Sequence, residues 1–229
     1  TEVEKRQWAK RREGERLERE RHARRAAEIA ADLIACASLA EHGYLKSKGL
    51  AQCRGLVTPD HVLVVPMRSI DTNELRGAQK ISLVENEWRK KFIFGTRAKG
   101  AVLRIGPERA AESILVEGYA TGLSVDLAAR KLCMRAAIYV TFSADNLAHV
   151  AQLIGGRRYV IADNDESGTG QRVAEATGLP WAMSERTGED ANDLHQRAGL
   201  MAVARLLMAC KSTRAGGAQR SGERHALSR

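Results

Sequence analysis

The sequence predicts an α+β N-terminal subdomain followed by an α/β domain, in which helices cover both faces of a parallel central sheet. Short apolar segments and helical patterns alternate after Gly106-Pro107, as βαβ units with right-handed crossovers require. The segment before that boundary is instead rich in strand patterns joined by turn residues. Two of the later apolar segments end abruptly in acidic residues, and ligand sites in parallel sheets lie at the carboxyl ends of strands.

The alternating segment predicts buried strands, because short apolar runs between polar turn residues are typical of parallel sheets. Strands are expected at 113–117, 136–142, 159–163 and 179–183. Helices are expected at 122–132, 145–154, 170–176 and roughly 190–208.

The first part of the chain predicts a helix and then a group of strands. Apolar residues keep helical spacing from Ala26 to Ala37, so this part of the helix should dock on a core. His42-Gly43 is interpreted as the stop signal, with Gly43 suited to a left-handed C-terminal cap. Strands are expected at 61–66, 75–83, 91–94 and 101–105.

These patterns divide the chain into four expected parts. They are a basic helical linker (1–25), a mixed α/β basic subdomain (26–108), the α/β domain with its C-terminal helix (109–210) and a basic disordered tail (211–229).

The net charge of +9 is concentrated at the two ends of the chain. Residues 1–25 hold ten Lys or Arg and six Glu, and residues 211–229 hold five Lys or Arg and one Glu. Basic ends favour a polyanionic partner such as nucleic acid, although basic tails also serve as solubilising segments.

Composition also limits the class of protein. There is no apolar run of membrane-spanning length and no signal-peptide pattern, so the expectation is a cytoplasmic protein without a membrane partner. The four cysteines are scattered without a Cys-x-x-Cys, which indicates neither a zinc ribbon nor a disulfide framework.

Carboxylates at two expected strand ends are the strongest chemical signal. Glu117 ends one strand, and Asp163 and Asp165 end another. Because side chains alternate along an extended chain, Asp163 and Asp165 can point the same way. If the strands are neighbours, the three acids converge and repel one another unless a cation lies between them. Mg²⁺ suits such a site, although an Asp-x-Asp alone is more often a solvated turn or a helix cap.

These residues resemble a known family. Val116-Glu117-Gly118-Tyr119 followed by Asp163-Asn164-Asp165 is similar to the Toprim signature of primases, topoisomerases, some nucleases and recombination proteins. Further motifs come in the order seen in bacterial-type primases, and two are similar to plasmid- and phage-encoded primases. The motifs in that order are Val65–Asp71, Lys91–Gly100, Glu117–Tyr119, Phe142–Leu147 and Asp163–Gln171. The two that are similar to plasmid- and phage-encoded primases are His42–Gly49 and Glu189–Leu194, so the resemblance covers roughly residues 40–200.

The resemblance implies roles for specific residues. Glu117, Asp163 and Asp165 would be the catalytic carboxylates that hold Mg²⁺ or Mn²⁺. Asp190 or Asp193 would be an accessory metal ligand, with Asp190 equally suited to capping a helix.

The resemblance also implies that basic side chains of the expected subdomain 26–108 bind template and nucleotide. Lys91, Arg97 and Lys99 would contact template or incoming triphosphate, although an exposed hairpin with solvated lysines explains the same stretch. Arg68 would assist, unless it is a structural arginine at a strand end.

The implied function is a DNA primase core that makes short RNA primers on single-stranded DNA from nucleoside triphosphates. The alternatives are a Toprim-type metal-dependent DNA nuclease or nicking enzyme, and a non-catalytic single-stranded nucleic-acid-binding replication subunit. The sequence contains no Gly-x-x-x-x-Gly-Lys-Ser/Thr loop, so a replicative helicase is expected on a separate chain or a missing segment.

Overall fold

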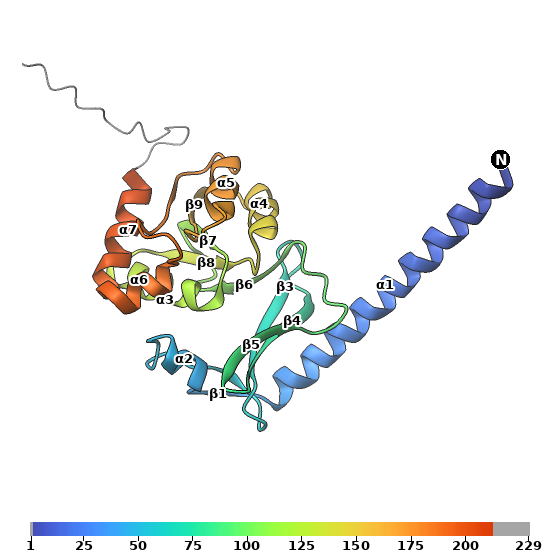
Figure 1. Ribbon diagram of the computed structural model, residues 1–229, viewed down its shortest axis with the longest axis horizontal. Helices are drawn as coiled ribbons and strands as arrows, with labels where there is room; N and C mark the ends of the chain where they lie inside the picture. Colours follow the sequence, from blue (N-terminus) through green and yellow to red (C-terminus); the bar gives the residue numbers. More distant parts are fainter. Residues whose placement is uncertain (1, 213–229) are drawn as a thin grey trace, which may run out of the picture.

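The computed structural model describes residues 2–212, and most of the expected tail at 211–229 lies outside these residues. Figure 1 shows a long N-terminal helix that projects from the body of the molecule, followed by a strand-rich part and then an α/β part. The expected fold class is confirmed. The four expected divisions stay predictions, since the sheet runs continuously across residue 108.

Helix α1 runs without a break from Glu2 to Cys36, across the expected linker boundary at residue 25. Its second half docks on the strands, where Ala26 and Ala30 are fully buried in a cluster with Val64 and Ala78. The residues before this docked portion are almost all exposed. The docking expected from helical spacing is therefore confirmed, and the preceding segment continues the same helix.

The expected stop at His42-Gly43 is wrong. Helix α1 already ends at Cys36, and the short strand β1 (Ser38–Ala40) follows it. His42 instead begins helix α2 (Gly43–Ser47), because its ring nitrogen accepts a hydrogen bond from the amide of Tyr44. Capping at a helix start requires an acceptor side chain, which His42 supplies.

The strands of the first part form antiparallel pairs, with β3 between β2 and β4. They are β2 (Gly55–Val57), β3 (Leu63–Ser69), β4 (Leu75–Val84), β5 (Glu87–Phe92) and β6 (Ala101–Ile105). Strand β5 lies earlier than the expected 91–94, and Phe94 is in the following loop, where it is 80% exposed.

The α/β part has the expected parallel strands, with β7 at the centre between β8 and β9. Its elements are β7 (Glu112–Val116), α3 (Tyr119–Lys131), β8 (Ala136–Val140), α4 (Ala144–Leu153), β9 (Arg157–Ile161), α5 (Thr169–Ala176) and β10 (Trp181–Ala182). Strand β6 pairs antiparallel with both β3 and β8, so it joins the two parts into one sheet.

Helices cover both faces of this parallel region. On one face, Leu123 of α3 packs in the same core as Leu194 and Leu207 from the two C-terminal helices. On the other face, Leu147 of α4 packs with Ala174 of α5. Two separate apolar layers therefore hold the strands whose carboxyl ends carry the acids.

The single helix expected over roughly 190–208 is instead two helices, α6 (Ala191–Ala198) and α7 (Leu200–Ser212). Gly199 lies between them with a φ of 78°, in the left-handed region that favours glycine. The break lets both helices pack on α3 while α6 begins next to the acidic strand ends. Among the described helices, none is both long and apolar enough to span a membrane.

We expect Asn146→Ala to destabilise the protein by about 3 kcal/mol, because Asn146 joins α4 to β6. Its buried side-chain amide donates to the carbonyls of Ala101 (2.8 Å) and Thr141 (2.7 Å) and accepts from the amide of Gly100 (2.6 Å). The substitution leaves three buried backbone groups unsatisfied. Urea unfolding checks this, with the exposed Gln152→Ala on the same helix as the control; equal effects of the two substitutions would contradict it.

Candidate metal-dependent active site

Parallel pairing of β7 and β9 brings the first two acids to one edge of the sheet. Ile114 is opposite Tyr159 and Leu115 is opposite Val160. Glu117 directly follows β7 and Asp163 lies two residues beyond the end of β9. The condition under which the sequence brings the acids together, that these two strands are neighbours, is met.

Asp163 carries the most perturbed carboxyl group of this edge. Its Oδ1 atom is buried and has no hydrogen-bond partner among the described residues. Burial raises the pKa of Asp163 to about 7, and the nearby carboxylates of Asp190, Glu117, Asp165 and Asp193 add to the rise. A buried acceptor without a donor is costly, so this oxygen is poised to gain a cation or a proton.

Glu117 is half-buried and belongs to the same electrostatic cluster. Its pKa is also raised, first by burial and then by the carboxylates of Asp165, Asp145 and Asp190. Lys90 acts in the opposite direction and lowers this pKa. The neighbouring carboxylates therefore disfavour the ionised form of Glu117, as the sequence predicts for a cation site.

Asp165 caps helix α5 as well as facing the other acids. Its Oδ1 accepts a hydrogen bond from the amide of Thr169 (3.1 Å), its Oδ2 accepts from Gly170 (2.8 Å), and the hydroxyl of Ser167 also donates to it. These bonds, led by that from Ser167, lower the pKa of Asp165 to about 2. Asp165 is therefore ionised at neutral pH, while Asp163 beside it titrates near neutrality.

Asp190 and Asp193 form a capping box at the start of α6. Asp190 Oδ1 accepts from the amides of Asn192 (2.7 Å) and Asp193 (2.8 Å), and its Oδ2 accepts from the hydroxyl of Thr121 (3.0 Å). Asp193 Oδ2 accepts from the amide of Asp190 in return (3.3 Å). The capping alternative for Asp190 is confirmed, and the same carboxylate still acts on Asp163 through space.

A network that the sequence did not reveal fixes the Asp-Asn-Asp loop. Asn164 donates its side-chain amide to the carbonyl of Ser184 (2.9 Å), and its backbone pairs with Glu189. The guanidinium of Arg197 in turn donates two hydrogen bonds to the Glu189 carboxylate, from Nε to Oε1 (2.5 Å) and from Nη2 to Oε2 (2.9 Å). These contacts connect the loop of Asp163 and Asp165 to the start of α6, so the acids keep a common position.

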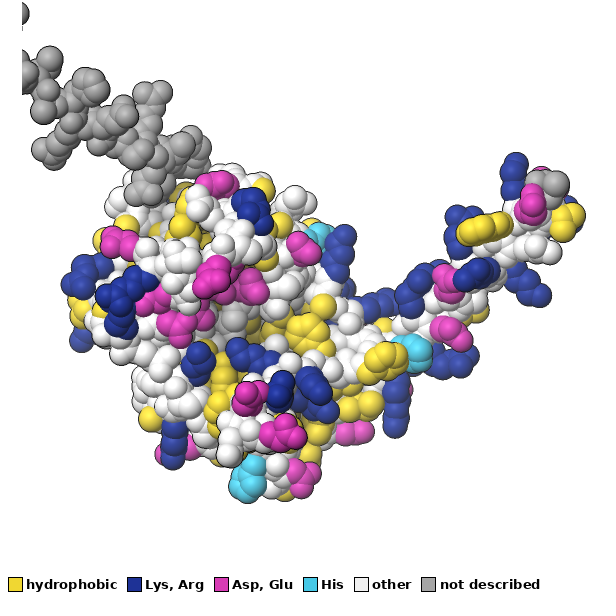
Figure 2. Space-filling model, in the orientation of Figure 1, with side chains coloured by type: hydrophobic (Ala, Val, Ile, Leu, Met, Phe, Trp, Pro, Cys, Tyr) yellow, Lys and Arg dark blue, Asp and Glu magenta, His cyan; other side chains and the backbone are white. Residues whose placement is uncertain are grey.

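Strand β5 presents one of its faces to the acids. Trp88, Lys90 and Phe92 alternate on this face: the Trp88 ring packs on Tyr44, and Lys90 Nζ lies 5.4 Å from the centre of the Tyr44 ring. Phe92 meets Phe142, which follows β8, with ring centres 6.0 Å apart and perpendicular planes. Figure 2 shows basic and apolar side chains over this strand part next to the acidic side chains of the α/β part.

Sequence reasoning did not single out Lys90, and the basic residues that it did single out lie elsewhere. Lys91 alternates with Lys90 and is on the opposite face of β5. Arg68 donates to the carbonyl of Asn73 (3.0 Å) and so closes the turn between β3 and β4. Arg97 and Lys99 are exposed in the loop before β6, where Arg97 borders a cavity against α1.

Comparison with known proteins identifies the part that carries the acids. Residues 112–200 match the Toprim domain family, and this segment contains all five candidate acids. This segment is a Toprim domain. A search of curated proteins found no significant match.

Two solved structures have a similar arrangement. One is the DnaG catalytic core, with a TM-score of 0.44, 16% identity, and coverage of 81% of this chain and 71% of that chain. The other is a bacteriophage T7 lagging-strand DNA polymerase interacting with primase domains of two gp4 subunits bound to an RNA/DNA hybrid and dTTP. It has a TM-score of 0.43, 12% identity, and coverage of 65% of this chain and 76% of that chain.

The acids of the Toprim domain suit a hard divalent cation. Asp163 offers a buried oxygen without a hydrogen bond, beside the carboxylates that raise its pKa. Within residues 2–212, no three acidic, His or Cys side chains already surround one point as a full ligand set, since Asp165 and Asp190 are turned towards helix amides. Mg²⁺ needs only one or two protein carboxylates, because water and phosphate oxygens complete its octahedron.

We expect Lys90→Gln to weaken the binding of an anionic ligand at the Toprim domain far more than Lys91→Gln does. Both lysines are exposed, and only Lys90 lies on the face that acts on Glu117. Removing its charge should also raise the pKa of Glu117 further, because the cation that favours the ionised form is lost. Fluorescence titration with a labelled oligonucleotide and with a nucleoside triphosphate checks this, and a larger loss for Lys91→Gln would contradict it.

Proposed function

We propose that the protein is the catalytic core of a DNA primase, which synthesises short RNA primers on single-stranded DNA by metal-dependent nucleotidyl transfer. One observation supports the proposal most: the acids of the Toprim domain gather at one sheet edge, and Lys90 of the strand-rich part lies close enough to lower the pKa of Glu117 there. A site that joins anionic substrates needs both features.

Glu117, Asp163 and Asp165 would hold Mg²⁺ or Mn²⁺ in this proposal, with Asp190 or Asp193 as an accessory ligand. The bound cations would favour deprotonation of the attacking 3′-hydroxyl and neutralise the triphosphate. Asp165 is suited to the role because its pKa of about 2 keeps it anionic. Asp163 requires a cation beside it in order to be ionised fully at neutral pH.

The strand-rich part would orient the anionic substrates. Lys90 is placed to contact a phosphate next to Glu117, and the exposed edge of Phe92 is placed to pack against a base. Arg97, Lys99 and Lys91 would bind the template more peripherally, and Arg68 serves the turn that it closes. A cytoplasmic location and a helicase partner accompany this proposal.

A single incubation tests the function. The chain is mixed with unprimed single-stranded DNA, labelled nucleoside triphosphates and Mg²⁺ or Mn²⁺, and the products are separated on a denaturing gel. Short labelled products that require the metal are expected. Shortened or nicked DNA without incorporation would support the nuclease instead, and no metal-dependent product would favour a subunit that only binds nucleic acid.

A further inference from the structure

A row of basic and aromatic side chains lies along the projecting part of α1. Lys5, Trp8, Arg12, Arg16 and Arg19 are spaced three or four residues apart, so they share one face of this helix. We call these five residues the α1 row. No Glu interrupts it, although Glu15 and Glu4 border it. Lys5, Trp8 and Arg12 line one surface hollow, and Arg16 and Arg19 line the next.

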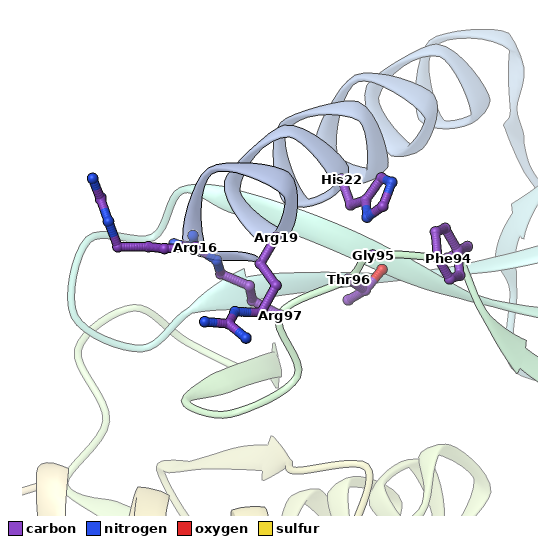
Figure 3. Close-up of a pocket in the computed structure, with 7 residues that line it drawn as sticks. All are labelled: Arg16, Arg19, His22, Phe94, Gly95, Thr96 and Arg97. Carbon is purple, nitrogen blue, oxygen red and sulfur yellow. The ribbon is translucent and has the colours of Figure 1, made fainter. Parts of the chain in front are cut away.

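The α1 row ends at a cavity between α1 and the loop that follows β5. This cavity has a volume of about 390 Å³, and its lining is completed by His22, Phe94, Gly95, Thr96 and Arg97. Figure 3 shows Arg16, Arg19 and Arg97 together on one side, with His22 and Phe94 on the other. The His22 and Phe94 rings are in edge contact, with centres 5.0 Å apart. The loop that carries Arg97 therefore extends the α1 row onto the body of the protein.

Close backbone packing fixes this junction. Gly95 has a φ of 88°, and a Cβ atom on it would lie 2.5 Å from the backbone carbonyl oxygen of His22. Only glycine allows the loop to approach the helix so closely. Arg97 is consequently held next to the α1 row by backbone contact rather than by flexible side chains.

The charges of the row are available to an external anion. Lys5, Arg12 and Arg97 form no ion pair within residues 2–212, and Arg19 has only a 4.0 Å contact with Glu15. Arg16 pairs with Glu13 (2.6 Å) and Glu20 (2.7 Å), but these pairs are exposed and such pairs contribute little. Several guanidinium groups around one cavity repel each other until an anion lies between them.

We propose that the α1 row and the Arg97 loop form a binding track for single-stranded nucleic acid. Trp8 is 64% exposed and Phe94 is 80% exposed, and aromatic side chains between basic ones are the platforms on which unpaired bases stack. A duplex hides its base faces, so the track favours a single strand. From Lys5 to Arg19 it extends about 21 Å, at the helical rise per residue. The inference rests on the proposed function only in taking this strand to be the template.

Two triple variants test the track with equal changes of charge. Lys5→Ala/Arg12→Ala/Arg19→Ala removes three cations of the α1 row, and Arg6→Ala/Lys10→Ala/Arg21→Ala removes three exposed cations from the other side of the same helix. Binding of a labelled single-stranded oligonucleotide is measured over a series of salt concentrations. We expect the row variant to bind at least about tenfold more weakly at low salt and to lose about two units of salt slope, because about 0.7 unit accompanies each phosphate contact.

The aromatic position has its own readout. Trp8→Ala should weaken single-strand binding about tenfold with an unchanged salt slope, because a stacking contact releases no counterions. Circular dichroism verifies that the helix persists in every variant. Equal effects of the two triple variants would overturn the track, as would unchanged binding in the row variant, or a preference of the row for duplex DNA or anionic lipid vesicles.

Failure of the track and failure of the proposed function give different results. If only the track proposal is wrong, the parent synthesises primers and the row variant binds the oligonucleotide as tightly as the parent does. If only the proposed function is wrong, the parent forms no primers, but the row variant still binds the oligonucleotide more weakly and with a smaller salt slope. Short oligonucleotides that reach only the Toprim domain should be bound equally by the parent and the row variant.

Discussion

Asp163→Asn is expected to reduce primer synthesis by several orders of magnitude while leaving the metal-free protein folded. Asparagine has nearly the same size as aspartate but offers a neutral oxygen, and Mg²⁺ requires hard anionic ligands. The buried Oδ1 of Asp163 has no hydrogen bond to lose within the described residues. Synthesis is measured by nucleotide incorporation, and the exposed turn residue Asp60→Asn is the matched control.

The same substitution should stabilise the metal-free protein at neutral pH. The folded-state pKa of Asp163, about 7, exceeds the ordinary 3.8, so the folded chain binds more protons than the unfolded chain between these values. Stability of the parent therefore falls as the pH rises through this window, by at most about 4 kcal/mol. The asparagine side chain of the variant would not titrate in this window, so the stability of the variant relative to the parent should increase from pH 4 to pH 7.

Thermal melts of both proteins in a chelator and in Mg²⁺ measure this difference. Added Mg²⁺ should stabilise the parent more than the variant, since it binds the folded parent more tightly. A variant that unfolds, or whose advantage is the same at pH 4 and pH 7, would show that Asp163 is a structural carboxylate.

Gly170→Ala is expected to have the largest effect among substitutions that leave the acids intact. A Cβ atom at Gly170 would lie 2.1 Å from the backbone carbonyl oxygen of Asp163, which cannot rotate away. Either α5 or the acidic loop must move, at a cost of about 2–4 kcal/mol. The movement also removes the amide of Gly170 from Asp165.

The expected results are a lower melting temperature and loss of primer synthesis even at saturating Mg²⁺. Gly155→Ala in the same domain is the control, because a Cβ atom there has nothing within 4 Å and the backbone angle needs no glycine. Normal activity of Gly170→Ala would contradict the view that close packing of α5 places the acids.

The sequence predicted the acidic edge well because its signals are local. Strands β7 and β9 are apolar runs that end in acid, although their pairing does not follow from chain order, because β8 lies between them in the sequence. Burial on both faces makes such strands recognisable without any tertiary information. Glu117 and Asp163 could therefore be placed at the carboxyl ends of strands, while the pairing that brings them together comes from the fold.

The strand-rich part was harder to predict because its signals are weak. Strand β5 is an edge strand with mostly exposed residues, so it lacks the apolar pattern of a buried strand. Its position determines which lysine faces the acids, and a shift of one residue exchanges Lys90 for Lys91. The three-residue strands β1 and β2 are too short for any periodicity to appear.

The supporting network could not be predicted at all. The Asn164, Ser184, Glu189 and Arg197 contacts join segments that are adjacent only after folding. Asp190 had equal signals for capping and for metal binding, and hydrogen-bond geometry showed that it caps α6. Sequence patterns give the residue types at such a site, while tertiary packing decides which partner each of them takes.

Template-directed incorporation tests the central claim most directly. The parent and Asp163→Asn are given single-stranded DNA of one defined sequence, with each of the four nucleoside triphosphates labelled in turn, with and without Mg²⁺ or Mn²⁺. The account predicts short products whose composition is complementary to the template, which require the metal and are absent with Asp163→Asn. The account would be contradicted by products whose composition does not depend on the template, or by incorporation that persists in Asp163→Asn. DNA cleavage without incorporation would also contradict it.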